Sequence, residues 1–104
     1  MARQFKVEYD EALREHMAKK GLTTIVVEVM SSQSSDFEFT ELYPHLIPDK
    51  QVPYFKEKKH FWSVQGELGE VLLPPYRLEY DDTLRFSLKK FWIFHSLKQT
   101  GIRL

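Results

Sequence analysis

The sequence predicts a single α+β domain in which one N-terminal helix packs on a β-rich, mostly antiparallel sheet of about six strands. Two observations predict this class. Only one segment, near the N-terminus, combines helical spacing of apolar residues with signals at both helix ends. The rest of the chain holds short apolar and aromatic runs bounded by Pro, Gly and Ser, which is typical of strands. Composition is uniform along the chain, so residues 1–104 are predicted to form one domain.

The helix is predicted over residues 11–20, directly after a short alternating strand over residues 5–9. Asp10 has the side chain of an N-cap, which accepts hydrogen bonds from the first free backbone N–H groups of a helix. Gly21 follows as a C-terminal stop, because glycine readily adopts the left-handed conformation that ends many helices.

Alternation and β-branched residues predict the strands that follow. They cover residues 23–30, 37–42, 60–65, 70–73, 84–89 and 91–97, with a short final strand at 101–104. Residues 31–36 are predicted to be a polar loop, and residues 43–54, which hold three prolines, an extended surface loop. Residues 66–69 suit the turn of a hairpin, and residues 81–82 suit another turn.

Composition removes several classes of function. The chain contains no cysteine, so disulfides, cysteine-ligated zinc or iron–sulfur clusters and thiol nucleophiles are excluded within it. The formal net charge is zero, which argues against nucleic-acid binding. The sequence shows neither a signal-peptide core nor an apolar run of membrane length, and we expect a soluble cytoplasmic protein without membrane contact.

The histidines offer a candidate metal site. His45, His60 and His95 can converge on a metal ion together with a carboxylate, because imidazole and carboxylate groups are common metal ligands. The spacing of the histidines contains no HxH, HxxH or HExxH motif. Packed or surface histidines are the alternative interpretation.

The serine-rich segment offers a candidate anion site. The hydroxyls of Ser31, Ser32, Ser34 and Ser35, with the backbone amides of a turn, can bind an oxyanion. No Gly-x-Ser-x-Gly or Ser-x-x-Lys motif of a serine nucleophile is present. A solvated loop is the alternative interpretation.

A lysine–aromatic motif occurs twice, at residues 58–62 and 89–92. Paired cations beside exposed rings suit single-stranded nucleic acid, which needs positive charge for its backbone and aromatic faces for base stacking. Successive side chains of a strand point to opposite faces, so one ring of each pair belongs to the core while the lysines guard the strand ends. We prefer this second interpretation and keep a small nucleic-acid-binding module as a further alternative.

An opening strand and helix at residues 5–13, a buried strand at 24–29 and the C-terminal segments 80–92, 94–97 and 101–104 form one pattern. This pattern, which covers most of the chain, resembles short HesB-like proteins. These are relatives of the A-type iron–sulfur carriers, and some carry a paired-cysteine or cysteine–selenocysteine motif. The resemblance implies a HesB-like α+β fold.

The sequence departs from this family where the thiols belong. The family's thiol-bearing loop follows the first long strand, and this chain has four serines and a glutamine at that place, residues 31–35. The glycine–cysteine motif near the C-terminus of the carriers is also absent. Thiolates hold iron as soft, charged ligands, and neutral serine hydroxyls do not replace them. The resemblance therefore implies that the scaffold was kept and the thiol metal ligands were lost.

We therefore predict a non-catalytic binding or assembly protein that uses this scaffold without a cofactor and holds a protein partner or associates with itself. Residues 1–52 carry six Lys/Arg and nine Asp/Glu, and residues 53–104 carry nine and six, an asymmetry that favours association. Interface centres are rich in aromatic residues. The candidates here are Trp62, Trp92, Tyr54, Phe55 and Tyr76. The alternative is a metal- or iron–sulfur-related accessory protein that uses histidine and carboxylate ligands.

Overall fold

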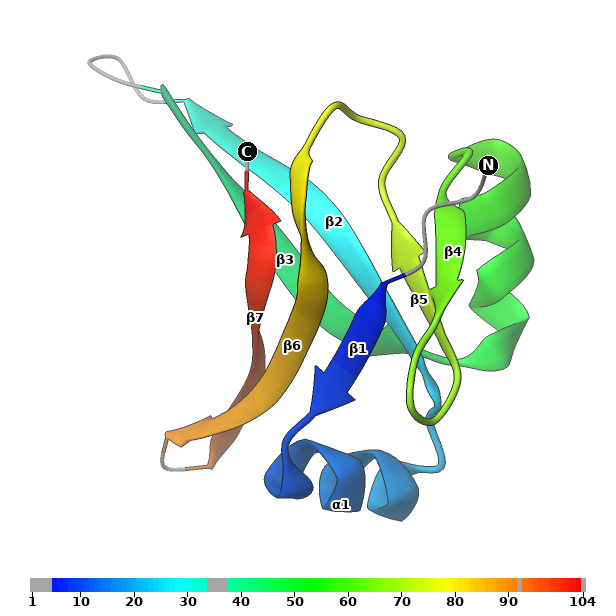
Figure 1. Ribbon diagram of the computed structural model, residues 1–104, viewed down its shortest axis with the longest axis vertical. Coiled ribbons are helices and arrows are strands. Elements are labelled where there is room, and N and C mark those ends of the chain that lie inside the picture. Colours follow the sequence, from blue (N-terminus) through cyan, green and yellow to red (C-terminus); the bar gives the residue numbers. More distant parts are fainter. Residues whose placement is uncertain (1–4, 34–37, 92, 104) are drawn as a thin grey trace.

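The computed structural model describes residues 5–33, 38–91 and 93–103, which form one α-helix, two shorter helical turns and seven strands (Figure 1). The elements in chain order are β1 (Lys6–Tyr9), α1 (Glu11–Lys20), β2 (Thr24–Gln33), β3 (Glu38–Ile47), η1 (Asp49–Gln51), η2 (Tyr54–Lys58), β4 (Trp62–Gln65), β5 (Glu70–Leu73), β6 (Glu79–Phe91) and β7 (Phe94–Arg103). The strands form a small sheet with the order β1-β6-β7 and a large sheet with the order β3-β2-β5-β4. The β1/β6 and β2/β5 pairs are parallel, and the β2/β3, β4/β5 and β6/β7 pairs are antiparallel.

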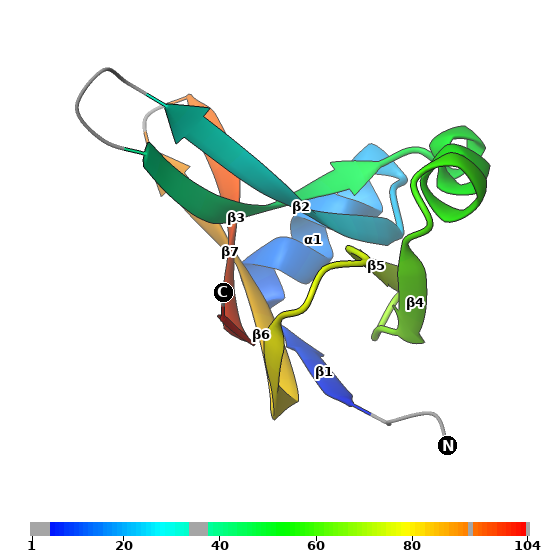
Figure 2. The same cartoon turned by 90° about the horizontal axis from the view of Figure 1, so that it is seen from above.

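The α+β class and the high strand content are confirmed, whereas the single sheet of about six strands is wrong. The two sheets face each other, and Figure 2 looks between them, with α1 across the far end of the space. Apolar alternation shows that a strand has a buried side, but it carries no information on which strand is the neighbour. The same pattern therefore suits one sheet or two. No helix in the described part of the chain is long and apolar enough to cross a membrane.

The main core lies between the two sheets and α1. Its buried members are Val7, Tyr9, Leu13, Met17, Ile25, Val27, Val71, Leu73, Leu84, Phe86 and Ile102. A second cluster covers the outer face of the large sheet and consists of Val26, Ile47, Phe55, Phe61 and Leu72. Both faces of the large sheet are thus buried at its centre, which explains why the middle of β2 is a continuous apolar run without alternation.

The proline-bearing segment is not the extended loop predicted over residues 43–54. Its first part, through Ile47, completes β3, and its second part forms the helical turns η1 and η2. Pro44 is tolerated in β3 because this strand is the last of its sheet, so the missing N–H group need not face a neighbour. The turns place the Phe55 ring against the large sheet, where Phe55 is buried.

Two polar segments that suggested loops or turns belong to long strands. Ser31 and Ser32 extend β2 and pair with β3, so the predicted loop begins later in the chain. Asp81 and Asp82 lie inside β6, where the register with β7 is irregular between Tyr80 and Arg85. Adjacent aspartates are typical of turns, but a β-bulge also exposes consecutive polar residues without ending the strand.

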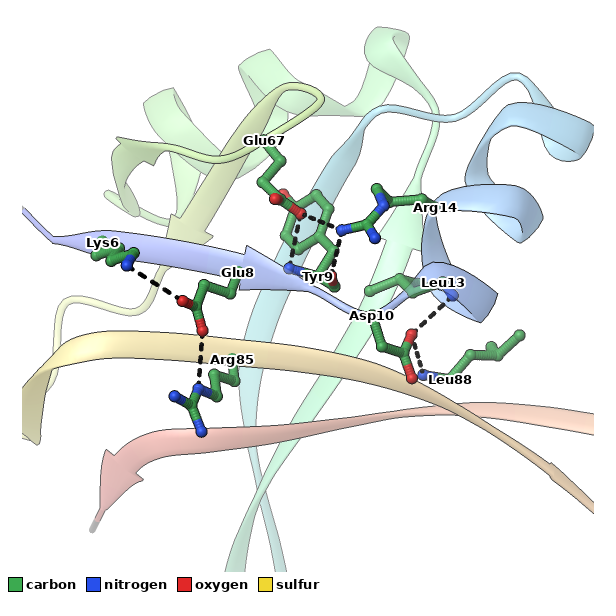
Figure 3. Close-up of polar contacts among 9 residues, drawn as sticks. All are labelled: Lys6, Glu8, Tyr9, Asp10, Leu13, Arg14, Glu67, Arg85 and Leu88. Carbon is green, nitrogen blue, oxygen red and sulfur yellow. Dashed lines mark hydrogen bonds and ion pairs between the residues drawn. The ribbon is translucent and has the colours of Figure 1, made fainter.

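Asp10 joins the start of α1 to the small sheet. Its Oδ1 atom accepts hydrogen bonds from the backbone N–H groups of Leu13 at 2.8 Å and Leu88 at 3.4 Å (Figure 3). The Asp10 N–H group donates to the Phe86 carbonyl at 3.1 Å. Gly21 ends the helix with a φ of 69°, so the predicted bounds of this helix are confirmed.

Replacing Asp10 tests this junction. Asp10→Ala removes the acceptor for two backbone N–H groups, and we expect the free energy of unfolding in urea to fall by about 1–2 kcal/mol. Asp10→Asn retains a side-chain oxygen and is expected to recover most of this loss. An Ala variant as stable as the unmodified chain would contradict the capping role.

Candidate functional site

Aromatic rings cover the space between the two sheets along one side of the molecule, which we call the closed side. The ring centroids of Phe5 and Tyr80 lie 5.5 Å apart, and those of Trp62 and Tyr80 also lie 5.5 Å apart. The Trp62 indole N–H donates to the Pro74 carbonyl at 3.2 Å. These contacts join β4 of the large sheet to β6 of the small sheet and to the residue before β1.

Glu67 covers the free edge of β1 on this closed side. Its carboxylate accepts a hydrogen bond from the Tyr9 backbone N–H group at 2.7 Å and pairs with Arg14 at 3.3 Å (Figure 3). Arg14 in turn donates to the Tyr9 carbonyl. Burial, and then the charge of Glu67, raise the pKa of the Tyr9 hydroxyl to about 12. Side chains thus satisfy both backbone groups of Tyr9, at the end of the free edge of β1.

The opposite side of the molecule is open. Here β3 and β7, the last strands of their sheets, pass each other with Cα atoms within 8 Å (Figures 1 and 2). In the described residues neither strand pairs with the other through backbone hydrogen bonds. Two depressions of about 360 and 340 Å³ lie between the strands and share four lining residues. We call this continuous depression the groove.

Strand edges, and not strand faces, line the groove. Its walls are the consecutive residues 41–46 of β3 and 95–99 of β7. Alternate residues of a strand share one face, so a lining of consecutive residues means that the groove follows the backbone. Leu42, Leu46 and Leu97 are half-buried against the main core and form the apolar floor.

The open edge of β7 ends at Gln99. The Gln99 amide donates to the Ile102 carbonyl and accepts from the Ile102 N–H group, both at 3.2 Å. This side chain occupies backbone groups that a neighbouring strand would otherwise use. The edge of β7 that faces the groove is therefore residues 95–98.

Three histidines line the α1 end of the groove. The rings of His16 and His95 are stacked, with centroids 5.0 Å apart and an interplanar angle of 23°. His45 lies beside them on β3, where its ring stacks on Tyr43 and its Nε2 atom lies 2.5 Å from a Glu28 carboxylate oxygen. Lys20 completes the polar lining at this end.

Burial and neighbouring positive charge both act on His16. Burial is the larger cause that lowers the pKa of the His16 imidazole, and the charges of His95, Lys20 and Lys19 act in the same direction. A lowered pKa means that protonation of this imidazole is less favourable than in free histidine, and a nearby anion would oppose that effect.

The predicted metal ligands are only partly brought together. His45 and His95 line the same end of the groove, together with His16, whereas His60 is exposed between η2 and β4. Within the described residues, no three histidine, aspartate or glutamate side chains are grouped closely enough to hold a metal ion. The metal-site prediction did not include His16. Its position next to the buried Met17 is the sequence signal that could have placed it at the border of the helix's apolar face.

The four aromatic candidates that the structure describes separate into three groups. Tyr54 and Tyr76 are exposed. Lys59 lies between them: its ammonium is 5.8 Å from the centre of the Tyr54 ring, and Lys59 and Tyr76 line the same depression. Trp62 is partly exposed on the closed side of the sheets. Phe55 is only 6% exposed and belongs to the second core, so it is not part of an exposed surface. Trp92 lies outside the described residues.

The serine segment is only partly described. Ser34 and Ser35 lie outside the described residues, and the backbone of Ser31 and Ser32 belongs to β2, paired with Thr40 and Phe39. The anion-site prediction for these four serines stays a prediction.

No protein-family model, no curated protein and no solved structure matches this chain. The function is therefore inferred from the geometry of the groove.

Proposed function

We propose that this chain is a non-catalytic binding protein, on a HesB-like scaffold without thiol ligands, that holds an extended segment of a partner protein in the groove between β3 and β7. The observation that carries this proposal is the contrast between the two sides of the molecule. On one side Glu67 and Arg14 bind the backbone of Tyr9 at the free edge of β1, and on the other residues 95–98 present their backbone to a groove with an apolar floor. An extended chain supplies the N–H and C=O groups that pair with such an edge.

The segment pairs with β7, and β3 forms the side wall. Pro44 has no N–H group, so it interrupts the row of donors on the outer edge of β3. Residues 95–98 of β7 contain no proline. The half-buried leucines of the floor then receive the side chains of the segment that point into the groove, as in other modes of strand addition.

The small separation between β3 and β7 favours a single segment as the occupant over a second folded domain. A strand inserted midway between two others needs them about 9.6 Å apart, because neighbouring strands are spaced about 4.8 Å. Some Cα atoms of β3 and β7 lie within 8 Å of each other, so the two strands must move apart for a segment to enter between them. A strand that already belongs to another sheet would bring its own neighbours and collide with β3. This favours a segment over the edge strand of a second copy.

Filling the groove tests the proposal. Ser96 is exposed and lines both depressions, so Ser96→Trp places a large ring in the groove without removing core contacts. We expect this variant to weaken at least about tenfold the binding of peptides selected from a displayed library of short random sequences. Affinity is measured by isothermal titration calorimetry.

Thr100→Trp is the matched control. Thr100 is exposed on the same strand, four residues beyond Ser96, and does not line the groove. We expect this variant to bind the selected peptides within roughly twofold of the unmodified chain. Equal binding by the Ser96→Trp variant, or equal loss in both variants, would contradict the groove as the binding site.

A further inference from the structure

We infer that the α1 end of the groove binds the free C-terminal carboxylate of the inserted segment, an inference that rests on the proposed function. Two elements bring protonatable nitrogen groups together at this end: His16 and Lys20 from α1, and His95 from β7. His16 and Lys20 are four residues apart, so their side chains lie on the same side of the helix. A carboxylate between these groups accepts charge-assisted hydrogen bonds, which are stronger than neutral ones.

The charge along the groove is uneven. No carboxylate is among the described residues that line the α1 end, and Glu28, which lies against His45 of that lining, is paired with its imidazole. Toward the other end the lining contains one acidic residue, Glu41, and one basic residue, Lys98. The Lys20 ammonium at the α1 end therefore attracts an anionic group of the segment, whereas Glu41 and Lys98 balance each other at the other end.

The direction of β7 indicates that the anionic group at the α1 end is the C-terminal carboxylate of the segment. Along the groove, β7 runs from His95 at the α1 end toward Gln99 at the other end. An antiparallel partner, which is the more stable arrangement, runs the opposite way. Its last residue then lies beside His95, where its terminal carboxylate faces Lys20 and the imidazoles of His16 and His95. Capture of a C-terminal carboxylate is an established way for proteins to recognise peptide ends.

Protonation of His16 couples this binding to pH. The groups that face or adjoin His16 are His95 from β7, His45 and Tyr43 from β3, Leu22 after the helix, and Lys19 and Lys20 on its own helix. Burial and the neighbouring positive charges lower the pKa of the His16 imidazole in the free protein, and a bound carboxylate favours the protonated form. Binding then takes up a proton, so affinity rises as pH falls from about 8 toward about 6.

The experiment uses library peptides displayed with free C-termini and then synthesised in two forms, as the free acid and as the C-terminal carboxamide. We expect the carboxamide to bind at least about tenfold more weakly, since it loses a charge-assisted interaction. Lys20→Met is expected to weaken binding of the free acid by a similar factor. Lys19→Met, which removes a neighbouring charge outside the groove lining, is expected to change it by roughly twofold or less.

The outcomes separate this inference from the proposed function. If acid and carboxamide bind equally while Ser96→Trp still blocks both, the carboxylate site is wrong and the groove stands. An acidic side chain in the peptide that restores binding of the carboxamide would likewise overturn the assignment to the terminus. If Ser96→Trp blocks neither form, both claims fail. His16→Gln is expected to flatten the pH dependence of affinity, and an unchanged slope would remove His16 from the site.

Discussion

Phe86→Ala is expected to lower the free energy of unfolding by about 3–5 kcal/mol, the largest effect of any substitution considered for this chain. Phe86 lies on β6 in the main core and is only 1% exposed. Its ring packs edge-to-face against Tyr9, with centroids 6.1 Å apart. Removing it leaves a cavity between β6, β1 and α1, and the close-packed surroundings relax only partly into such a space.

Urea unfolding followed by circular dichroism measures this loss. Ile93→Ala is the matched control, because it also removes a large apolar side chain but from a position that is 83% exposed. We expect the control to change the free energy of unfolding by about 0.5 kcal/mol or less. Similar losses for the two variants would show that β6 is not packed into the core as described.

Gly101→Ala is expected to destabilise the chain by roughly 3 kcal/mol or more, because two separate penalties act at this position. Gly101 has a φ of 104°, a conformation that residues with a Cβ atom rarely adopt. A Cβ atom there would also lie 2.5 Å from the Thr83 carbonyl oxygen of β6, a backbone atom that cannot move away freely. The position lies opposite the bulge that lets β6 continue through Asp81 and Asp82.

Gly21→Ala separates the two penalties. Gly21 also has a positive φ, 69°, but a Cβ atom added there meets nothing within 4 Å. We therefore expect a loss of only about 1 kcal/mol, from the backbone conformation alone. If the two alanine variants unfold at the same urea concentration, the close approach of β7 to β6 at Gly101 is wrong.

Local signals predicted the elements whose ends are fixed by neighbouring residues. Asp10 and Gly21 bound α1 through their own side chain and backbone, and both signals are visible in the sequence. The hairpin of β4 and β5 is likewise confirmed, because its turn residues lie between two short apolar runs. Such features depend on contacts within a few residues of the chain.

Pairing between distant segments could not be predicted in the same way. β1 pairs with β6 from the far end of the chain, and nothing in either strand's alternation specifies that neighbour. Pro44 suggested a loop because proline usually leaves a sheet, and its place in β3 is explained only by the strand's position at the sheet edge. The division into two sheets follows from these pairings.

The candidate site depends on the same long-range pairings. His16, His45 and His95 come from three different elements, and only the packing of α1, β3 and β7 places them along one groove. Adjacent aromatics also could not be sorted by sequence, since Tyr54 is exposed while Phe55 is buried one residue later. Burial at such positions is decided by which sheet face the helical turn covers.

Hydrogen exchange on the chain with and without a selected peptide locates the bound segment on the protein. We expect slower exchange of backbone amides within residues 95–98 of β7, because a bound segment pairs with that edge. We expect little change at Tyr9, whose N–H group already donates to Glu67. Protection around Lys59 and Tyr76 instead, with residues 95–98 unchanged, would contradict the groove as the binding site.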